Sequence, residues 1–80
     1  MSSKKNQLEI YIVEIVKIKR KELKLSQVDI AKELDVSVGY IGQIESNKLK
    51  SMYSYNQLNQ LAIIFNCSPK DFMPEKAIIE

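Results

Sequence analysis

Two short stretches of helical pattern, 27–34 and 37–46, stand only two or three residues apart. Apolar residues recur in each at helical spacing, and each has a serine at its start, Ser26 for the first and Ser37 for the second. A serine side chain accepts hydrogen bonds from the backbone amides of a first helical turn, so both stretches are predicted to begin as helices there. A linker this short forces the two helices to cross steeply. This pair constrains the fold more than any other feature of the chain.

Three further helices are predicted around the pair. The segment 7–23 continues a helical pattern without a break, although its β-branched run IYIVEIV would also fit a strand. Its buried face is predicted to comprise Ile12, Ile15, Val16 and Leu23, with Ile10 and Val13 on the opposite face. A fourth helix is predicted after Ser54, where apolar residues repeat at amphipathic spacing, and a short fifth between Ser68 and Pro74. The sequence therefore predicts an all-α fold, a compact five-helix bundle.

A chain of 80 residues is expected to form one domain. We expect a disordered N-terminal tail at 1–6, the folded domain at 7–73 and a C-terminal tail at 74–80. The single cysteine, Cys67, excludes an intramolecular disulfide and fits a reducing compartment. No apolar run approaches the ~20 residues of a transmembrane helix, and the N-terminus lacks the pattern of a signal peptide. A cytoplasmic location without membrane contact is therefore expected.

Catalysis and metal binding find no support in the residue types present. The chain has no histidine and one cysteine, which leaves few ligands for a transition metal. No pairing of a nucleophile with a base stands out, and no glycine-rich loop could cradle a phosphate. We therefore expect a protein that is not an enzyme and needs no cofactor and no metal.

Charge is unevenly distributed, although the net charge is only +2. The segment 17–24, KIKRKELK, carries five positive charges against the one negative charge of Glu22. Lys48 and Lys50 form a second basic group, while acidic residues gather within 29–35. The molecule is therefore predicted to have separate basic and acidic regions.

The stretch QVDIAKELDVSVGYIGQIES, at 27–46, resembles the helix-turn-helix unit of the phage-repressor and Cro-like family of transcriptional regulators. The residues that carry the resemblance are Gln27, Ala31, Leu34, Val36, Ile41, Ile44 and Glu45, and the likeness extends over about 12–73. The resemblance implies a fold of the lambda-repressor-like DNA-binding type. One departure is Asp35, which stands where the family usually has glycine in the turn. Aspartate tolerates the left-handed backbone conformation, so we expect strain at Asp35 and no change of fold.

The resemblance implies that the second helix of the pair docks in the DNA major groove. On that helix Gly39, Gly42, Gln43 and Ser46 share one face, opposite Ile41 and Ile44. A glycine inside a helix costs about 1 kcal/mol relative to alanine, yet both glycines of the chain lie here. Small side chains would let the helix backbone approach the DNA closely; alternatively, the glycines are tolerated surface residues or face another protein. The predicted base-reading residues are Val38, Gly39 and Gln43.

Contacts to the DNA backbone are predicted on both sides of this face. The candidates are Gln27, Ser37, Tyr40, Asn47, Lys48 and Lys50, although each lysine alone would also suit a solvated surface. By the same resemblance, Arg20 is expected to pair with Glu45 and to tie the reading helix to the scaffold. The alternative for Glu45 is simple exposure.

The predicted function is that of a sequence-specific DNA-binding transcriptional regulator, either repressing by excluding polymerase or contacting it. Apolar residues beyond the needs of one core suggest a homodimer on a palindromic operator; they are Ile10, Tyr11, Val13, Ile63, Ile64, Met73, Ile78 and Ile79. An antitoxin with a toxin partner and a restriction-modification controller are alternatives of similar size. A protein-interaction module that keeps the fold without binding DNA is the alternative from another class.

Overall fold

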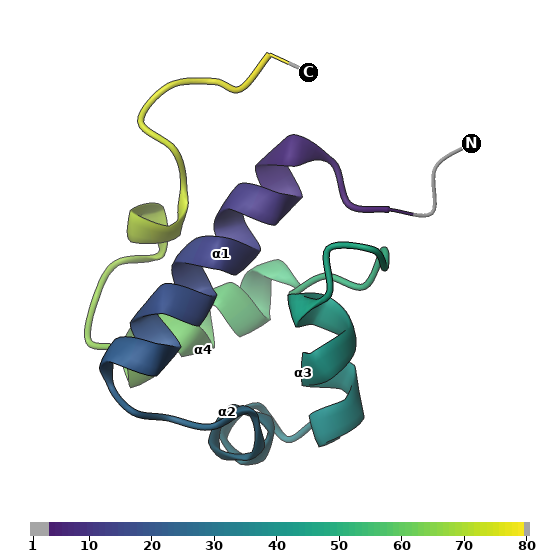
Figure 1. The fold of residues 1–80 in the computed structure, drawn as a ribbon. Coiled ribbons are helices and arrows are strands. Elements are labelled where there is room, and N and C mark those ends of the chain that lie inside the picture. The colour runs from purple at the N-terminus through teal and green to yellow at the C-terminus, as the bar shows by residue number, and fades with distance from the viewer. Residues whose placement is uncertain (1–3, 80) are drawn as a thin grey trace.

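The structure, a computed structural model, describes residues 4–79, which contain four α-helices and one 3-10 helix (Figure 1). The helices are α1 (Gln7–Glu22), α2 (Gln27–Leu34), α3 (Val38–Glu45) and α4 (Tyr55–Ile64), and the 3-10 helix is η1 (Pro69–Phe72). The prediction of an all-α fold is confirmed for these residues, but the prediction of five helices is wrong. The fifth element is a 3-10 turn of four residues, because Met73 precedes a proline and takes an extended backbone.

Polar side chains begin every helix; the sequence indicated the serines that begin α2, α3, α4 and η1, but not Asn6 at the start of α1. In α1, α2, α4 and η1 the cap accepts from a backbone amide while the side chain three residues on accepts from the amide of the cap, which is a capping box. The four pairs are Asn6 with Glu9, Ser26 with Asp29, Ser54 with Gln57, and Ser68 with Asp71. The amide of Ser26 also lowers the pKa of the Asp29 carboxyl, because it donates a hydrogen bond to the ionised form.

Three helices end in the same left-handed turn, and none uses a glycine. Lys24, Asp35 and Asn66, after α1, α2 and α4, have φ angles of 59°, 57° and 54°. The residue that follows each one donates its amide to the carbonyl five positions back, as in a Schellman motif. These bonds run from Leu25 to Arg20, from Val36 to Ala31 and from Cys67 to Ala62, at 3.0, 3.0 and 2.9 Å. The left-handed conformation expected for Asp35 is therefore present, and the chain turns there between α2 and α3.

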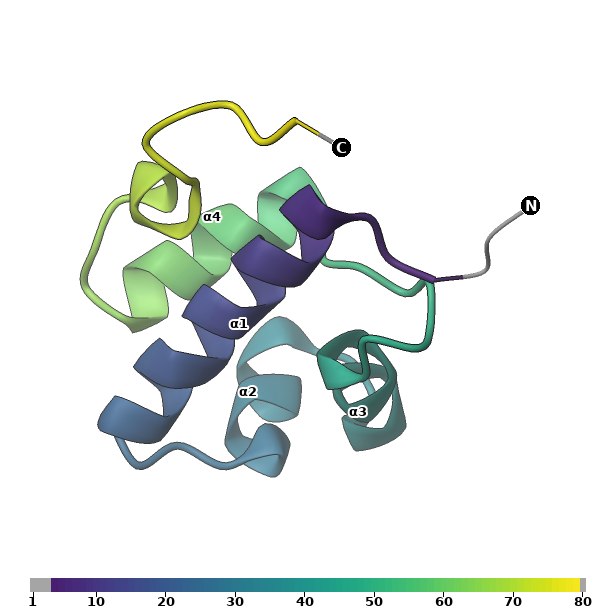
Figure 2. The same cartoon turned by 45° about the horizontal axis from the view of Figure 1, so that its top comes forward.

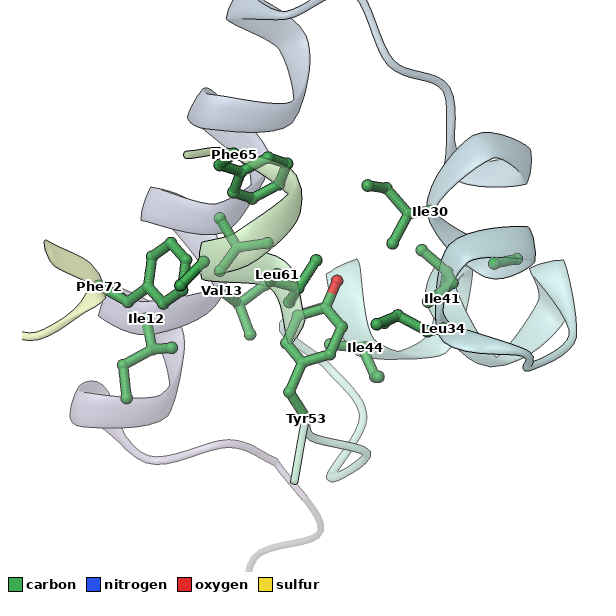
Figure 3. Packing of buried hydrophobic residues seen from close by; sticks show 13 residues of the cluster. Ile12, Val13, Ile30, Leu34, Ile41, Ile44, Tyr53, Leu61, Phe65 and Phe72 are labelled. Atoms are coloured by element: carbon green, nitrogen blue, oxygen red, sulfur yellow. The ribbon is translucent and has the colours of Figure 1, made fainter. Parts of the chain in front are cut away.

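A single apolar cluster lies between the helices (Figure 3). Its buried members are Ile12, Val13, Val16, Ile30, Ala31, Leu34, Ile41, Ile44, Tyr53, Leu61, Ala62, Phe65 and Phe72. Phe72, on η1, meets Phe65 edge to face with ring centroids 6.1 Å apart. Two expectations for α1 are wrong: Val13 is fully buried, whereas half of Leu23 is exposed. The reason is that α1 contacts both α3 and η1, so its buried face is broad, and Leu23 lies beyond its last turn.

The chain termini fall partly outside the described residues, which lack 1–3 and residue 80. Within the segment expected to be disordered, Lys5 and Asn6 make defined contacts: Asn6 caps α1 and Lys5 is buried. Residues 74–79 follow η1 without a further helix. No helix within 4–79 is long and apolar enough to cross a membrane.

Candidate nucleic-acid interface

The two short helices, α2 and α3, pack against each other and meet through the turn at Asp35. The amide of Val36 reaches back to the carbonyl of Ala31, so the chain reverses tightly before Ser37 caps the next helix. Both views of the fold place α3 at the edge of the bundle, with the long helix α1 on its other side (Figures 1 and 2). This arrangement leaves one side of α3 facing outward.

The inner and outer sides of α3 differ in exposure as the helical spacing requires. Ile41 and Ile44 are fully buried against the core. Val38 is 46% exposed, and Gly39 and Gln43 are also exposed. The outer ridge of α3 is defined here as Gly39, Gly42, Gln43 and Ser46, of which Gly42 and Ser46 are half-buried. The three predicted base-reading residues therefore lie on the outward side of the helix.

The two glycines of the ridge have space beside them. A Cβ atom added to Gly39 would lie 3.9 Å from the hydroxyl oxygen of Ser37, its nearest neighbour. A Cβ atom added to Gly42 would lie 3.8 Å from Oε1 of Gln27. Both separations are ordinary van der Waals distances, and neither glycine has a positive φ angle. The fold of the chain therefore does not require glycine at either position.

A neighbouring serine orients the side chain of Gln43. Ser51, in the segment after α3, donates its hydroxyl to Oε1 of Gln43 at 3.3 Å. The Gln43 amide nitrogen makes no hydrogen bond to any residue within 4–79, so its two N–H donors remain for a partner. The spacing of α3 predicted Gln43, but nothing in the sequence pointed to Ser51, because that contact depends on how the segment folds back.

An ion pair joins the end of α3 to α1. Arg20 donates from Nε to Glu45 Oε2 at 2.9 Å and from Nη2 to Oε1 at 3.0 Å, and its Nη1 donates to the Leu25 carbonyl at 2.8 Å. The two side chains are 9% and 5% exposed, so this bidentate pair is largely shielded from water. The structure thus brings together the two residues that the resemblance paired.

Gln27 is the third partner of this carboxylate. Its Nε2 donates to Glu45 Oε1 at 2.9 Å. Burial alone would raise the pKa of Glu45, but the hydrogen bonds from Arg20 and Gln27 outweigh it and lower that pKa. Gln27 is the first residue of α2 and keeps a second amide N–H. Its predicted phosphate contact stays a prediction.

The other predicted phosphate contacts lie beside the ridge. Ser37 caps α3 and accepts from the amide of Tyr40 at 3.1 Å, which leaves its own proton for a further acceptor. The Tyr40 hydroxyl donates to the Met52 carbonyl at 3.0 Å, so a phosphate contact would require that bond to open. The remaining candidates, Asn47, Lys48 and Lys50, are exposed in the segment after α3.

Lys5 is a charged residue at this site that the sequence did not reveal. Its ammonium group donates to three backbone carbonyls at the end of α3 and just beyond it. Lys5 precedes the residues that carry these carbonyls by at least 38 positions in the sequence. No local sequence pattern therefore connects Lys5 with them.

Comparison with known proteins supports the same fold. The sequence matches the helix-turn-helix family over residues 16–72, more than half of the chain. Among solved structures, the restriction-modification controller protein C.AhdI from Aeromonas hydrophila is 18% identical with a TM-score of 0.68, covering 81% of this chain and 96% of its own. Comparison with curated proteins found no match.

A second structural neighbour is an enzyme of greater length. Hydroxypropylphosphonic acid epoxidase from S. wedmorenis is 18% identical with a TM-score of 0.73, covering 88% of this chain and 36% of its own. The present chain therefore spans little more than a third of that enzyme. At these identities both likenesses concern the fold alone.

Proposed function

Because the chain belongs to the Cro/C1-type helix-turn-helix family of DNA-binding regulators, we propose that it binds operator DNA and regulates transcription by placing α3 in the major groove. The observation that carries the proposal is the outer ridge of α3. Its residues Gly39 and Gln43 are exposed, Gly42 and Ser46 are half-buried, and the fold does not require glycine at either glycine position. The two glycines on the ridge have no side chains, which lets the helix backbone approach a duplex closely there.

Base reading is assigned to the exposed side chains on and beside the ridge. Gln43, whose two amide N–H donors have no partner within 4–79 and whose oxygen accepts from Ser51, suits the N7 and N6 positions of adenine. Val38, half exposed at the start of α3, suits a thymine methyl group. Gly39 contributes by close backbone approach.

Phosphate contacts are assigned to the groups that flank the ridge. Asn47, Lys48 and Lys50 follow α3 and are exposed, while Ser37 and Gln27 stand at the starts of α3 and α2. Backbone amides at a helix start favour an anion, and lysines add the charge that makes binding depend on salt. Glu45 is not a base reader, because Arg20 and Gln27 hold both of its oxygens.

The chain is proposed to act as a homodimer on a palindromic operator. The apolar side chains away from α3 that are exposed include Tyr55 at 92%, Ile63 at 73% and Met73 at 46%. Tyr55 and Met73 also line a groove of about 730 Å³ between the start of α1, the start of α4 and η1. Such side chains could be buried against a second copy, and a two-fold dimer that reads a palindrome needs its two α3 helices about 34 Å apart, one turn of DNA.

A restriction-modification controller is the second candidate within this class. The observation in its favour is that C.AhdI has the same fold, with 96% of its length covered by this chain. An antitoxin role, with a toxin partner, and contact with RNA polymerase stay predictions, as does a cytoplasmic location. No catalytic role is proposed.

Selection of bound duplexes from a random pool tests the proposal. A pair of inverted half-sites one helical turn apart is the expected result, and log affinity should fall linearly as log salt rises. Gln43→Ala should cost about 1–3 kcal/mol at one operator position, whereas Lys48→Ala should weaken all duplexes alike. An affinity that does not respond to salt would instead favour a protein-interaction module.

A further inference from the structure

The ammonium group of Lys5 lies among three backbone carbonyl oxygens. Its Nζ donates to the carbonyls of Ser46 and Leu49, each at 2.7 Å, and more weakly to that of Gln43 at 3.5 Å. Only 5% of the residue is exposed. The N-terminal segment passes alongside the loop that follows α3, which brings the two together (Figure 2).

These carbonyls belong to a helix end that has no cation of its own. The last carbonyls of a helix lack partners within it, and the aligned peptide dipoles make that end negative. The last turns of α1 and α2 carry basic residues, whereas that of α3, like that of α4, carries none. Lys5 supplies the missing positive charge from the other end of the sequence. Burial lowers the pKa of Lys5, and the nearby charge of Glu9 acts in the opposite direction.

The backbone on which Lys5 stands is itself fixed. Asn6, the next residue, caps α1, accepting from the Glu9 amide at 2.8 Å and donating its own amide to the Glu9 carboxylate at 2.9 Å. At the far end of α1, Arg20 holds Glu45. The end of α3 is therefore attached to both ends of α1.

The segment that Lys5 holds, 46–51, carries several groups of the proposed interface. Asn47, Lys48 and Lys50 stand in it, and so does Ser51, which orients Gln43. An ammonium group has three N–H donors; here two carbonyls take donors at 2.7 Å and a third lies at 3.5 Å, which leaves little donor capacity for a phosphate.

We propose that Lys5 is a positioning residue for operator recognition: it fixes the end of α3 and the segment 46–51, and discrimination between DNA sequences depends on it without its touching DNA. This inference rests on the proposed function for its DNA part only. Its structural part, that Lys5 holds the end of α3, can be tested in the free protein.

Amide hydrogen exchange tests the structural part. The amides of Ser46 and Leu49 donate to the carbonyls of Gln43 and Ser46, which Lys5 also holds. Lys5→Gln should speed exchange at both amides roughly tenfold, as expected for a local opening, and leave unchanged the Phe65 amide, which follows α4 directly and donates to Leu61. Unchanged exchange at Ser46 and Leu49 would overturn the inference, whether or not the chain binds DNA.

Titration with a selected operator and a scrambled duplex tests the DNA part. Lys5→Gln should reduce the ratio of the two affinities roughly tenfold while the slope of log affinity against log salt stays the same. Lys76→Gln, which removes the same charge from the exposed C-terminal segment, should change neither, and Lys5→Arg should restore discrimination. The titrations should be made well below the melting temperature of every variant.

Two other outcomes of the titrations would overturn the inference, and a third would overturn the proposed function instead. A loss equal on both duplexes, with a salt slope lower by about one, would make Lys5 a phosphate contact and overturn the inference. Lower thermal stability with unchanged discrimination would make its role merely structural and also overturn it. If the DNA affinity of the wild-type chain did not change with salt, the proposed function would be wrong. The hydrogen-exchange measurement would then still decide the structural part of the inference.

Discussion

The inner side of α3 makes many contacts with the rest of the fold, whereas its outer side makes few. Ile41 and Ile44 are fully buried on the inner side, and Glu45 accepts hydrogen bonds from two other helices' residues. On the outer side, the spaces beside Gly39 and Gly42 are open. The inner side explains why the helix stays in place, but nothing in the fold explains the composition of the outer side.

The left-handed helix ends make the contrast sharper. Glycine would relieve strain at Lys24, Asp35 and Asn66, where φ is positive, yet the chain has other residues there. Both glycines lie instead in α3, where a helical backbone makes them costly. This placement of the glycines is the reverse of what stability alone favours. It indicates that a binding partner of α3, and not the fold, requires glycine there.

The largest effect is expected on the inner side, from Arg20→Met. The substitution leaves the Glu45 carboxylate buried without its cation, which should lower the free energy of unfolding by about 3 kcal/mol near pH 7. Urea denaturation measures this free energy of unfolding. Lys21→Met, an exposed position one residue on, should change stability by less than about 0.5 kcal/mol. Equal effects from the two variants would show that the pair contributes little.

The same pair gives a pH dependence of defined sign. The pKa of Glu45 is lowered in the folded chain, so its stabilisation is complete above the unfolded value of about 4.3 and is lost as the pH falls through the lower folded value. In Arg20→Met that pKa should rise, because burial then acts with less opposition. The stability deficit of the variant should therefore be greatest near neutral pH and shrink in acid; a deficit independent of pH would exclude this cause.

On the outer side, Gly42→Ala should act in opposite directions on stability and on binding. Alanine should raise the free energy of unfolding by about 1 kcal/mol, since the added methyl group meets only Gln27 at an ordinary distance. It should weaken binding to the selected operator roughly tenfold, or ~1.4 kcal/mol. Gly39→Ala, nearer the helix start, should gain less stability. A more stable variant with unchanged affinity would reduce the glycines to tolerated surface residues.

Lys24→Gly tests the other half of the contrast. Glycine at this left-handed position should raise stability by about 0.5–1 kcal/mol and leave DNA affinity unchanged, because the position lies at the end of α1 away from the ridge. Thermal unfolding and operator titration measure the two quantities. A loss of stability would mean that the Lys24 side chain contributes more than its backbone strain costs.

The smallest effect is expected in the core, at Tyr53. Its hydroxyl has no hydrogen-bond partner within 4–79, points into the apolar cluster (Figure 3), and has a pKa raised by burial. Tyr53→Phe should therefore leave stability within about 0.5 kcal/mol of the wild type or raise it. Tyr40→Phe, which removes the bond to Met52, should cost about 1 kcal/mol. A comparable loss from both would indicate that Tyr53 has a partner in solution.

Local signals allowed much of the fold to be predicted. The serine caps located the starts of α2, α3 and α4, and Asp35 was recognised as a left-handed turn residue. Spacing alone placed Gln43 on the outward side of α3. These features depend on neighbours within a few positions, which a sequence displays directly.

Contacts between distant segments were beyond prediction. Lys5 and Ser51 became relevant only because the chain brings them to α3, and a lone lysine or serine gives no hint of its partner. Val13 was misplaced because two elements pack on α1, which widens its buried face. The last element was bounded correctly by Ser68 and Pro74, but its 3-10 geometry was not predicted.

Amide chemical shifts recorded while a selected duplex is added test most directly whether α3 is the DNA-binding surface. The account predicts the largest shifts at Gly39, Gly42 and the side-chain amide of Gln43, with smaller ones at 47–50. Largest shifts along the groove between α1, α4 and η1, with α3 unchanged, would contradict it.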